Sequence, residues 1–322
     1  MSKSHPGTLH EYAPRLVAFE FTSSTPQKPH SLIFIGGLTD GLCTVPYVAP
    51  LAAALEPTDW SVFQAQLSSS FGGWGTGNLD KDVEEIAKCV DFVRSLKASA
   101  ATASAPGKIV IMGHSTGSQD VLHYLYSISP QGDRDWPVVD GAILQAPVSD
   151  REAMLAETRK PGAEGSVAKG AFEQLVSLAR QAPAADIILP LNLSSKVGLP
   201  PDPVSARRFL SLASPDSPAR PAEDDLFSSD LTDQRLRETF GAVATRGLLR
   251  SKLLVLYSGN DEFAAPWVDK EALMARWREA TEAGKAGTWD QNSGIIPGAS
   301  HNVRDEGQAD LVERVTRYLK GI

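Results

Sequence analysis

The chain has 322 residues, of which 42% are hydrophobic and 22% are charged, and its formal net charge is −8 at pH 7. A chain of this size and composition can bury a sizeable core, either as one large domain or as a core with an insertion. The negative charge argues against binding a polyphosphate backbone, so nucleic acid is not an expected partner, and it mildly favours a neutral or cationic substrate.

No targeting or membrane segment is expected. Residues 1–14 are polar and lack a basic start followed by an apolar core, and no stretch approaches the roughly 18 apolar residues of a membrane span. The sequence therefore predicts a cytoplasmic protein without a membrane partner. Cys43 and Cys89 lack metal-ligand spacing, so no metal is expected, and each is predicted to be a small residue in or near the core.

Strands and helices alternate along the chain, which predicts a mostly parallel sheet covered by helices on both faces. The apolar runs that predict strands lie at residues 16–21, 31–35, 60–67, 109–113, 141–147, 252–258 and 294–297. The apolar spacing typical of helices occurs at residues 45–55, 79–96 and 308–319. Residues 97–107 are rich in alanine and serine and are expected to form a frayed helix end and a linker.

The most informative motif follows the predicted strand at 109–113, where the chain reads Gly-His-Ser-Thr-Gly before a helix-compatible stretch. Glycine flanks the serine of a nucleophile elbow because the strained turn brings backbone segments too close for a side chain. The hydroxyl of Ser115 is then exposed at the carboxyl edge of the sheet, beside a helix N-terminus. Ser115 is therefore the predicted nucleophile, and His114 is expected to pack or hydrogen-bond beside it rather than to transfer protons.

A nucleophilic serine needs an orienting acid and a general base, which follow it in that order along the chain of such hydrolases. The strand at 252–258 ends in Gly-Asn-Asp-Glu, and we interpret Asp261 as the acid, with Glu262 pointing away from the site. Asp150 also follows a strand; it is the competing acid and otherwise a candidate substrate contact. His301 follows the last predicted strand and is the predicted base, because none of the other histidines occupies such a position.

Acyl transfer also needs two hydrogen-bond donors for the tetrahedral oxyanion. One is expected to be the amide of Thr116, the residue after the nucleophile. The second is expected from the loop Gly-Gly-Leu-Thr-Asp-Gly at 36–41, where the amide of Leu38 has the best position. The alternative is that this loop is a tight turn without a catalytic role.

A second glycine-rich loop follows the predicted strand at 60–67 and reads Ser-Ser-Ser-Phe-Gly-Gly-Trp-Gly-Thr-Gly. It lacks the Gly-Lys-Ser/Thr ending of a phosphate-binding loop and the spacing of a dinucleotide site. We interpret it as a mobile loop that lines the site and offers Ser69, Ser70 and Trp74 to a ligand. A plain flexible loop is an equally good interpretation.

About a hundred residues separate the predicted strands at 141–147 and 252–258, far more than a crossover helix needs. We expect a core of residues 1–148 and 234–322 and an insertion, 149–233, that forms a lid over Ser115; a peripheral decoration is the alternative. The insertion contains a helical stretch at 170–180. Its basic residues could be solvated or could contact a substrate, and they are Arg151, Arg159, Lys160, Arg207 and Arg208.

Four segments taken together carry a family resemblance: residues 36–41, 68–75 with 79–82, 113–120, and 145–151. They resemble the DUF1749 group of α/β-hydrolases, which includes fungal esterases of fusarinine-type siderophores. The resemblance implies an α/β-hydrolase fold with an inserted lid, with Ser115 as nucleophile, Asp261 as acid and His301 as base.

The resemblance also implies a reaction, the hydrolysis of ester bonds between hydroxyornithine-derived units of a cyclic siderophore, which helps to release iron after uptake. The partner is then a small-molecule ester such as an iron-loaded siderophore; no cofactor is implied, because any iron arrives chelated by the substrate. One alternative is a general carboxylesterase or lipase-like enzyme, which a lid lined by Phe209, Leu210 and Phe227 would favour. The other is a binding protein that kept the fold without catalysis.

Overall fold

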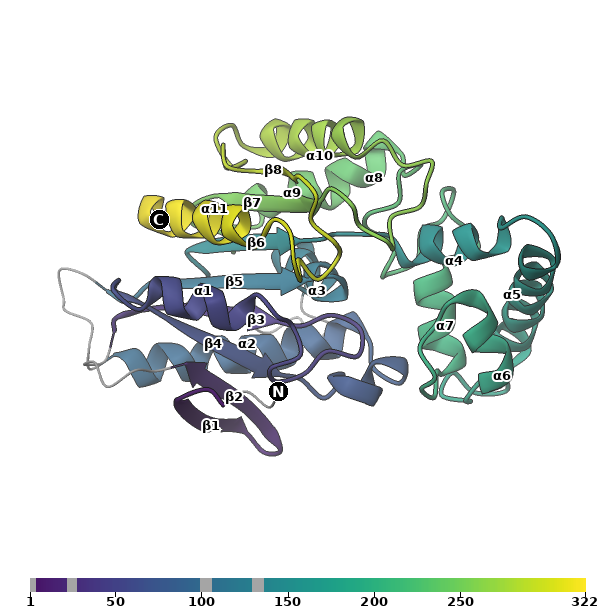
Figure 1. The fold of residues 1–322 in the computed structure, drawn as a ribbon, viewed down its shortest axis with the longest axis horizontal. Helices are drawn as coiled ribbons and strands as arrows, with labels where there is room; N and C mark the ends of the chain where they lie inside the picture. Colours follow the sequence, from purple (N-terminus) through teal and green to yellow (C-terminus); the bar gives the residue numbers. More distant parts are fainter. Residues whose placement is uncertain (1–3, 22–27, 99–105, 129–135) are drawn as a thin grey trace.

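The computed structural model describes residues 4–21, 28–98, 106–128 and 136–322, so most of the predicted linker at 97–107 lies outside the described residues. Its centre is an eight-stranded sheet in the order β1-β2-β4-β3-β5-β6-β7-β8 (Figure 1). The strands are β1 (Gly7–Ala13), β2 (Leu16–Phe21), β3 (His30–Ile35), β4 (Trp60–Gln66), β5 (Ile109–His114), β6 (Gly141–Gln145), β7 (Leu253–Ser258) and β8 (Gly294–Ile296). β1 and β2 pair antiparallel with their neighbours, and every pair from β4 to β8 is parallel. The predicted mostly parallel sheet is confirmed.

Both faces of the sheet are buried, because successive side chains of a strand point to opposite faces. In β3, Leu32 and Phe34 join one hydrophobic cluster, whereas Ile33 and Ile35 join the other. The first cluster is covered by α1 (Val48–Leu55) and α11 (Gln308–Gly321). The second is covered by α2 (Leu79–Lys97), α3 (Thr116–Tyr126), α8 (Asp233–Glu238), α9 (Phe240–Thr245) and α10 (Lys270–Gly284).

Several features of the fold differ from the sequence-based expectations. β1 was not predicted, because most of its side chains are exposed and its apolar pattern is correspondingly weak. α10 was also not predicted, although Leu273 and Trp277 on it are buried. The expectation that both cysteines lie in or near the core is wrong for Cys43, which is exposed on the loop after β3, whereas Cys89 is buried on α2.

The first part of the segment between β6 and β7 forms a separate group of helices that projects past one end of the sheet (Figure 1). These helices are α4 (Asp150–Thr158), α5 (Ala163–Gln181), α6 (Leu191–Ser194), the short 3-10 helix η2 (Ser195–Val197) and α7 (Ala206–Ala213). They share a hydrophobic cluster of their own, centred on residues such as Leu175 and Phe209. Farther along, Leu226, Phe227 and Leu231 pack into the main core again.

Among the residues that the structure describes, no helix combines the length and the apolar character that crossing a bilayer requires.

Candidate active site

Ser115 lies in the turn between β5 and α3, with a φ of 55° that non-glycine residues rarely adopt. Its amide donates to the carbonyl of Gln145 at 3.0 Å, and its own carbonyl accepts from the amide of Ser118 at 2.8 Å. A Cβ on Gly113 would lie 2.0 Å from the carbonyl oxygen of Gly117, and one on Gly117 would lie 2.6 Å from that of Ile35. The steric reason predicted for both glycines of the elbow is confirmed.

The structure brings His301 and Asp261 together from the loops after β8 and β7. Nδ1 of His301 lies 2.9 Å from each carboxylate oxygen of Asp261, and both residues are buried. Such a bond orients the ring and holds the proton on Nδ1, which leaves Nε2 to act as an acceptor. Asp150 contacts a different residue, because it accepts a hydrogen bond from Nε2 of Gln119 at 2.8 Å.

Glu262 also takes part in positioning His301. Its carboxylate accepts a hydrogen bond from the backbone amide of His301 at 2.8 Å. The expectation that Glu262 points away is therefore wrong for its carboxylate, which reaches the backbone of His301. Phe263 lies against the ring edge-on, with centroids 4.8 Å apart. Three consecutive residues after β7 thus fix one histidine.

His114 is buried within the elbow, and its ring lies 4.9 Å from that of His301. Nδ1 lies 2.5 Å from Oε1 of Gln145, and Nε2 lies 2.8 Å from Oδ1 of Asn302. Burial, reinforced by the neighbouring His301, lowers the pKa of His114 to about 4, so its ring is neutral at pH 7. The predicted packing role of His114 is confirmed.

The two backbone amides expected to face an oxyanion are not used elsewhere. Among the described residues, neither the amide of Leu38 nor that of Thr116 has a hydrogen-bond acceptor. The loop before Leu38 is turned by the amide of Gly37, which donates to Oδ2 of Asp40 at 2.9 Å. A Cβ on Gly37 would lie 2.6 Å from Cβ and 3.2 Å from Oγ of Ser115, so this loop packs directly on the serine.

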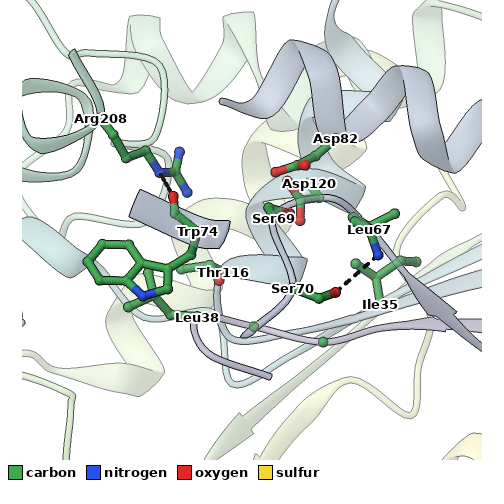
Figure 2. A pocket seen from close by; sticks show the side chains of 12 residues that line it. Ile35, Leu38, Leu67, Ser69, Ser70, Trp74, Asp82, Thr116, Asp120 and Arg208 are labelled. Atoms are coloured by element: carbon green, nitrogen blue, oxygen red, sulfur yellow. Dashed lines mark hydrogen bonds between the residues drawn. The ribbon is translucent and has the colours of Figure 1, made fainter. Parts of the chain in front are cut away.

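A cavity lies beside the same loop, and its lining comes from five segments of the chain (Figure 2). The lining residues are Ile35, Gly36, Gly37, Leu38, Leu67, Ser69, Ser70, Trp74, Asp82, Thr116, Asp120 and Arg208. The three residues expected to offer contacts to a ligand, Ser69, Ser70 and Trp74, are therefore all on its wall. Asp150 is not.

The glycine-rich loop itself has more structure than expected. Residues Phe71–Gly75 form a 3-10 helix, η1, and Oγ of Ser70 accepts from the amide of Leu67 at 3.0 Å. Trp74 is 2% exposed and donates from its indole nitrogen to Oδ2 of Asp202 at 3.0 Å. Most of the indole therefore packs against the helices between β6 and β7 instead of offering a free aromatic wall.

Sequence reasoning missed a cluster of buried charges at this cavity. Arg208 donates to both carboxylate oxygens of Asp224 at 2.7 Å, and Asp82 and Asp120 lie close by, with their oxygens near Ser69 (Figure 2). Burial raises the pKa of Asp82 to about 7 and raises that of Asp120 well above its usual range. The signal was present, because both acids belong to segments singled out in the sequence, but only the fold places them together.

The basic residues of the insertion have mixed roles. Arg208 is buried in the ion pair just described, and Arg151 is buried with ion pairs to Asp225 and Asp230. The guanidinium of Arg159 stacks on the ring of Trp267 at 4.1 Å. Arg151 is therefore neither solvated nor free to contact a substrate, because it is the partner in two structural ion pairs.

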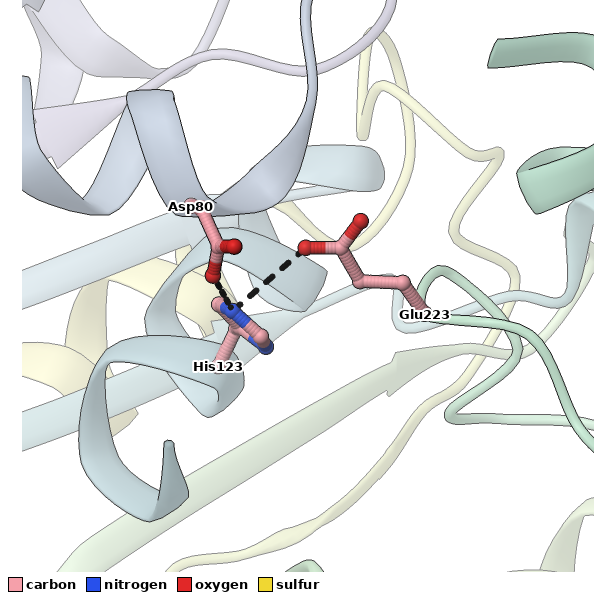
Figure 3. Close-up of side chains that lie close together, drawn as sticks. All are labelled: Asp80, His123 and Glu223. Carbon is pink, nitrogen blue, oxygen red and sulfur yellow. Dashed lines mark hydrogen bonds and ion pairs between the residues drawn. The ribbon is translucent and has the colours of Figure 1, made fainter. Parts of the chain in front are cut away.

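A second polar cluster joins α2, α3 and the insertion outside the cavity (Figure 3). Nε2 of His123 lies 2.9 Å from Oδ1 of Asp80 and 3.6 Å from Oε1 of Glu223, and its Nδ1 lies 3.1 Å from the hydroxyl of Tyr126. Three potential ligand atoms for a metal thus lie within 4.8 Å of one another. The contacts of His123 with Asp80, Glu223 and Tyr126 explain the cluster as a polar link between α2, α3 and the insertion.

Comparison with known proteins identifies the family of the chain. The model of one family, described as a protein of unknown function (DUF1749), matches residues 1–320. The chain is 49% identical to the Aspergillus fumigatus protein named "Fusarinine C esterase sidJ", over 98% of this chain and 96% of the relative. It is 50% identical to the solved structure of "Siderophore hydrolase EstB from Aspergillus fumigatus", with a TM-score of 0.85 and coverage of 99% and 98% of the two chains.

A more distant structure, an "Alpha/Beta hydrolase fold protein of unknown function", is 15% identical with a TM-score of 0.57 and covers 100% of this chain and 97% of its own. It is similar in fold alone. The predicted fold class is confirmed, and the chain belongs to the DUF1749 family of α/β-hydrolases.

Proposed function

We propose that this protein is a serine esterase that hydrolyses ester bonds of a hydroxamate siderophore of the fusarinine type. The observation that carries the proposal is the pairing of His301 with Asp261 on the same edge of the sheet as the strained Ser115. The names of two relatives, a fusarinine C esterase and a siderophore hydrolase, supply the substrate class.

In the proposed mechanism, His301 removes the proton from the hydroxyl of Ser115 as the serine attacks the ester carbonyl. Asp261 holds the imidazole in the required tautomer and stabilises the imidazolium. The amides of Leu38 and Thr116, for which the described part of the chain provides no acceptor, donate to the oxyanion. His301 then protonates the leaving alcohol, and water cleaves the acyl-enzyme by the same steps in reverse.

No step of this mechanism involves a cofactor. Iron enters only as part of the substrate, bound by hydroxamate oxygens. Release of iron from the opened siderophore inside the cell is part of the proposal, and a cytoplasmic location stays a prediction that cell fractionation can test.

The proposed lid is residues 149–233, which include helices α4 to α7, and it is attached to a core of residues 1–148 and 234–322. Support comes from their separate hydrophobic cluster and from Trp74, which packs into it from the cavity loop. Substrate access would then depend on the contact between η1 and these helices.

The general carboxylesterase is the second candidate, and the lid residues weigh against it. A lid for greasy esters would present Phe209 and Phe227 at its mouth, but Phe209 is 0% and Phe227 is 1% exposed. Leu210 is only partly buried. The cavity instead carries Asp82, Asp120 and Arg208, which suit a polar substrate.

The test compares hydrolysis of an iron-loaded fusarinine-type triester with that of a short-chain nitrophenyl ester, followed by mass spectrometry. Ser115→Ala is the matched background, since loss of the nucleophile typically costs at least about a thousand-fold in rate. We expect cleavage of the triester that depends on Ser115 and weak activity on the nitrophenyl ester. Cleavage of the nitrophenyl ester alone would favour the general esterase, and no cleavage of either would favour a binding protein.

A further inference from the structure

The cavity beside the Leu38 loop contains two buried carboxyl groups without a cation paired to them. Asp82 and Asp120 are 2% and 5% exposed, and Oδ1 of each has no hydrogen-bond partner among the described residues. Leaving a buried polar atom unpaired destabilises the folded protein, and more strongly when the group is charged. Two such atoms on the wall of one cavity indicate a missing partner.

The neighbouring arginine does not supply it. Arg208 donates through Nη1 to both oxygens of Asp224 and through Nε to the carbonyl of Trp74 at 3.1 Å. Its charge is therefore largely balanced by Asp224. The described residues that line the cavity include no second basic side chain, so one cation faces three carboxylates.

The free space suits a small donor group. The cavity leaves about 20 Å³ free, which accommodates one water-sized group. A primary ammonium head has this size, carries three N–H donors and needs acceptors on several sides. Two unpaired carboxylate oxygens and the hydroxyl of Ser69 on the same wall offer such acceptors.

The cavity also shares its wall with the groups that are proposed to act on the ester. Gly37, Leu38 and Thr116 line it, and Gly37 also packs against Ser115. A cation bound here therefore lies close to the oxyanion amides. We therefore place the amino group on the acyl part of the substrate, near the ester carbonyl.

We propose that Asp82 and Asp120 form a subsite for a primary ammonium group of the substrate, so that the enzyme prefers amino-bearing acyl esters. The proposal rests on the proposed esterase function and adds a determinant of specificity to it. Both carboxylates contact the ammonium directly through charge-assisted hydrogen bonds, and neither takes part in proton transfer at Ser115.

Three ethyl esters test the proposal: those of norvaline, of Nα-acetylnorvaline and of pentanoic acid, which share one carbon chain. Each kcat/KM is divided by the rate constant of alkaline hydrolysis, which removes the intrinsic effect of the amine on the ester. For the wild type we expect the norvaline ester to exceed both others by at least about tenfold, since one charge-assisted bond contributes about 1.5–3 kcal/mol.

The variants separate the subsite from general effects. Asp120→Asn and Asp82→Asn keep the side-chain shape and should reduce that preference to about threefold or less, through a fall in kcat/KM for the norvaline ester. Asp80→Asn removes the same charge from the exposed start of α2 and should retain the full preference. A wild type without preference, or a preference that survives in both buried variants, overturns the proposal.

A binding measurement separates failure of the subsite from failure of the esterase function. Norvalinamide and pentanamide are titrated into Ser115→Ala and into Ser115→Ala with Asp120→Asn, with the midpoint of thermal unfolding as readout. A rise that norvalinamide alone produces, and that Asp120→Asn abolishes, supports the subsite even if no ester is cleaved. Equal responses to both amides contradict it even if the siderophore is hydrolysed.

Discussion

Replacing Gly37 by alanine should damage the site through a steric contact that the structure specifies. The added Cβ would lie 2.6 Å from Cβ of Ser115, 2.8 Å from the carbonyl oxygen of His114 and 3.2 Å from Oγ of Ser115. The first distance is about 0.9 Å short of the ~3.5 Å at which carbon atoms pack. Neither neighbour can move freely, because Ser115 is held in the strained turn of the elbow and the carbonyl of His114 is part of the backbone that leads into it.

The expected loss follows from that shortfall. A displacement of about 1 Å between reacting groups can cost about a hundred-fold in rate, and overpacking typically costs about 1–3 kcal/mol of stability. We therefore expect kcat for a short-chain nitrophenyl ester to fall by about a hundred-fold and the free energy of unfolding in urea to fall by about 1–3 kcal/mol.

Gly170→Ala is the matched control. Gly170 lies in α5, and a Cβ there meets nothing within 4 Å. Alanine should raise the free energy of unfolding by about 0.5–1 kcal/mol and leave kcat unchanged. If Gly37→Ala kept more than half of the wild-type kcat at an unchanged unfolding free energy, the inference that this loop packs rigidly on Ser115 would be refuted.

Three further predictions concern buried polar groups. Asp261→Asn should lower kcat by about 10⁴-fold because the imidazole loses the partner that sets its tautomer, whereas Asp150→Asn should leave the pH profile of kcat unchanged. Asp202→Ala leaves the buried indole N–H of Trp74 without an acceptor and should reduce the free energy of unfolding by about 1–3 kcal/mol, measured in urea. Burial lowers the pKa of His114 to about 4 in the folded protein, whereas the pKa in the unfolded chain is near 6.5. Between these two values the unfolded chain binds a proton that the folded protein does not, so the stability present above pH 6.5 is lost as the pH falls towards about 4. The destabilisation caused by His114→Asn should therefore shrink over this range.

Each of these has a contrary result. A kcat that falls equally in Asp150→Asn would return Asp150 to the position of orienting acid. An Asp202→Ala protein as stable as wild type would mean that water replaces the lost acceptor. Asp82 and Asp150 have raised pKa values, so their effect on the pH dependence of stability is opposite to that of His114. Both residues are present in the wild type and in His114→Asn, so their contributions cancel when the two unfolding free energies are subtracted. A destabilisation that stays constant from pH 7 to pH 4 would contradict the neutral buried ring.

The chemistry of the elbow could be predicted from the sequence because it is local. Glycines around Ser115 are required by backbone contacts within a few residues and with the adjacent strand, so the motif itself carries the information. The same holds for the strands, since apolar runs that must be buried on both faces read as continuous hydrophobic segments. Strand β1 escaped prediction because its exposed side chains obey no such constraint.

Order along the chain also predicted which acid and which histidine would meet, but not how. Asp261 and Asp150 each follow a parallel strand, and only the folded loops show that Asp261 contacts His301 whereas Asp150 contacts Gln119. The choice depends on backbone turns after each strand, which no single segment encodes.

The tertiary structure alone decided the charge of the cavity. Asp82 lies on α2, Asp120 on α3 and Arg208 on α7, and each looks in sequence like an ordinary helical surface residue. Packing of the three helices around one loop removes water from all of them, and the pKa of a carboxylate depends on that removal more than on its neighbours in sequence. Local sequence thus determined the nucleophile and its strand framework, whereas long-range packing determined the buried acids beside it, because desolvation is a property of the assembled fold.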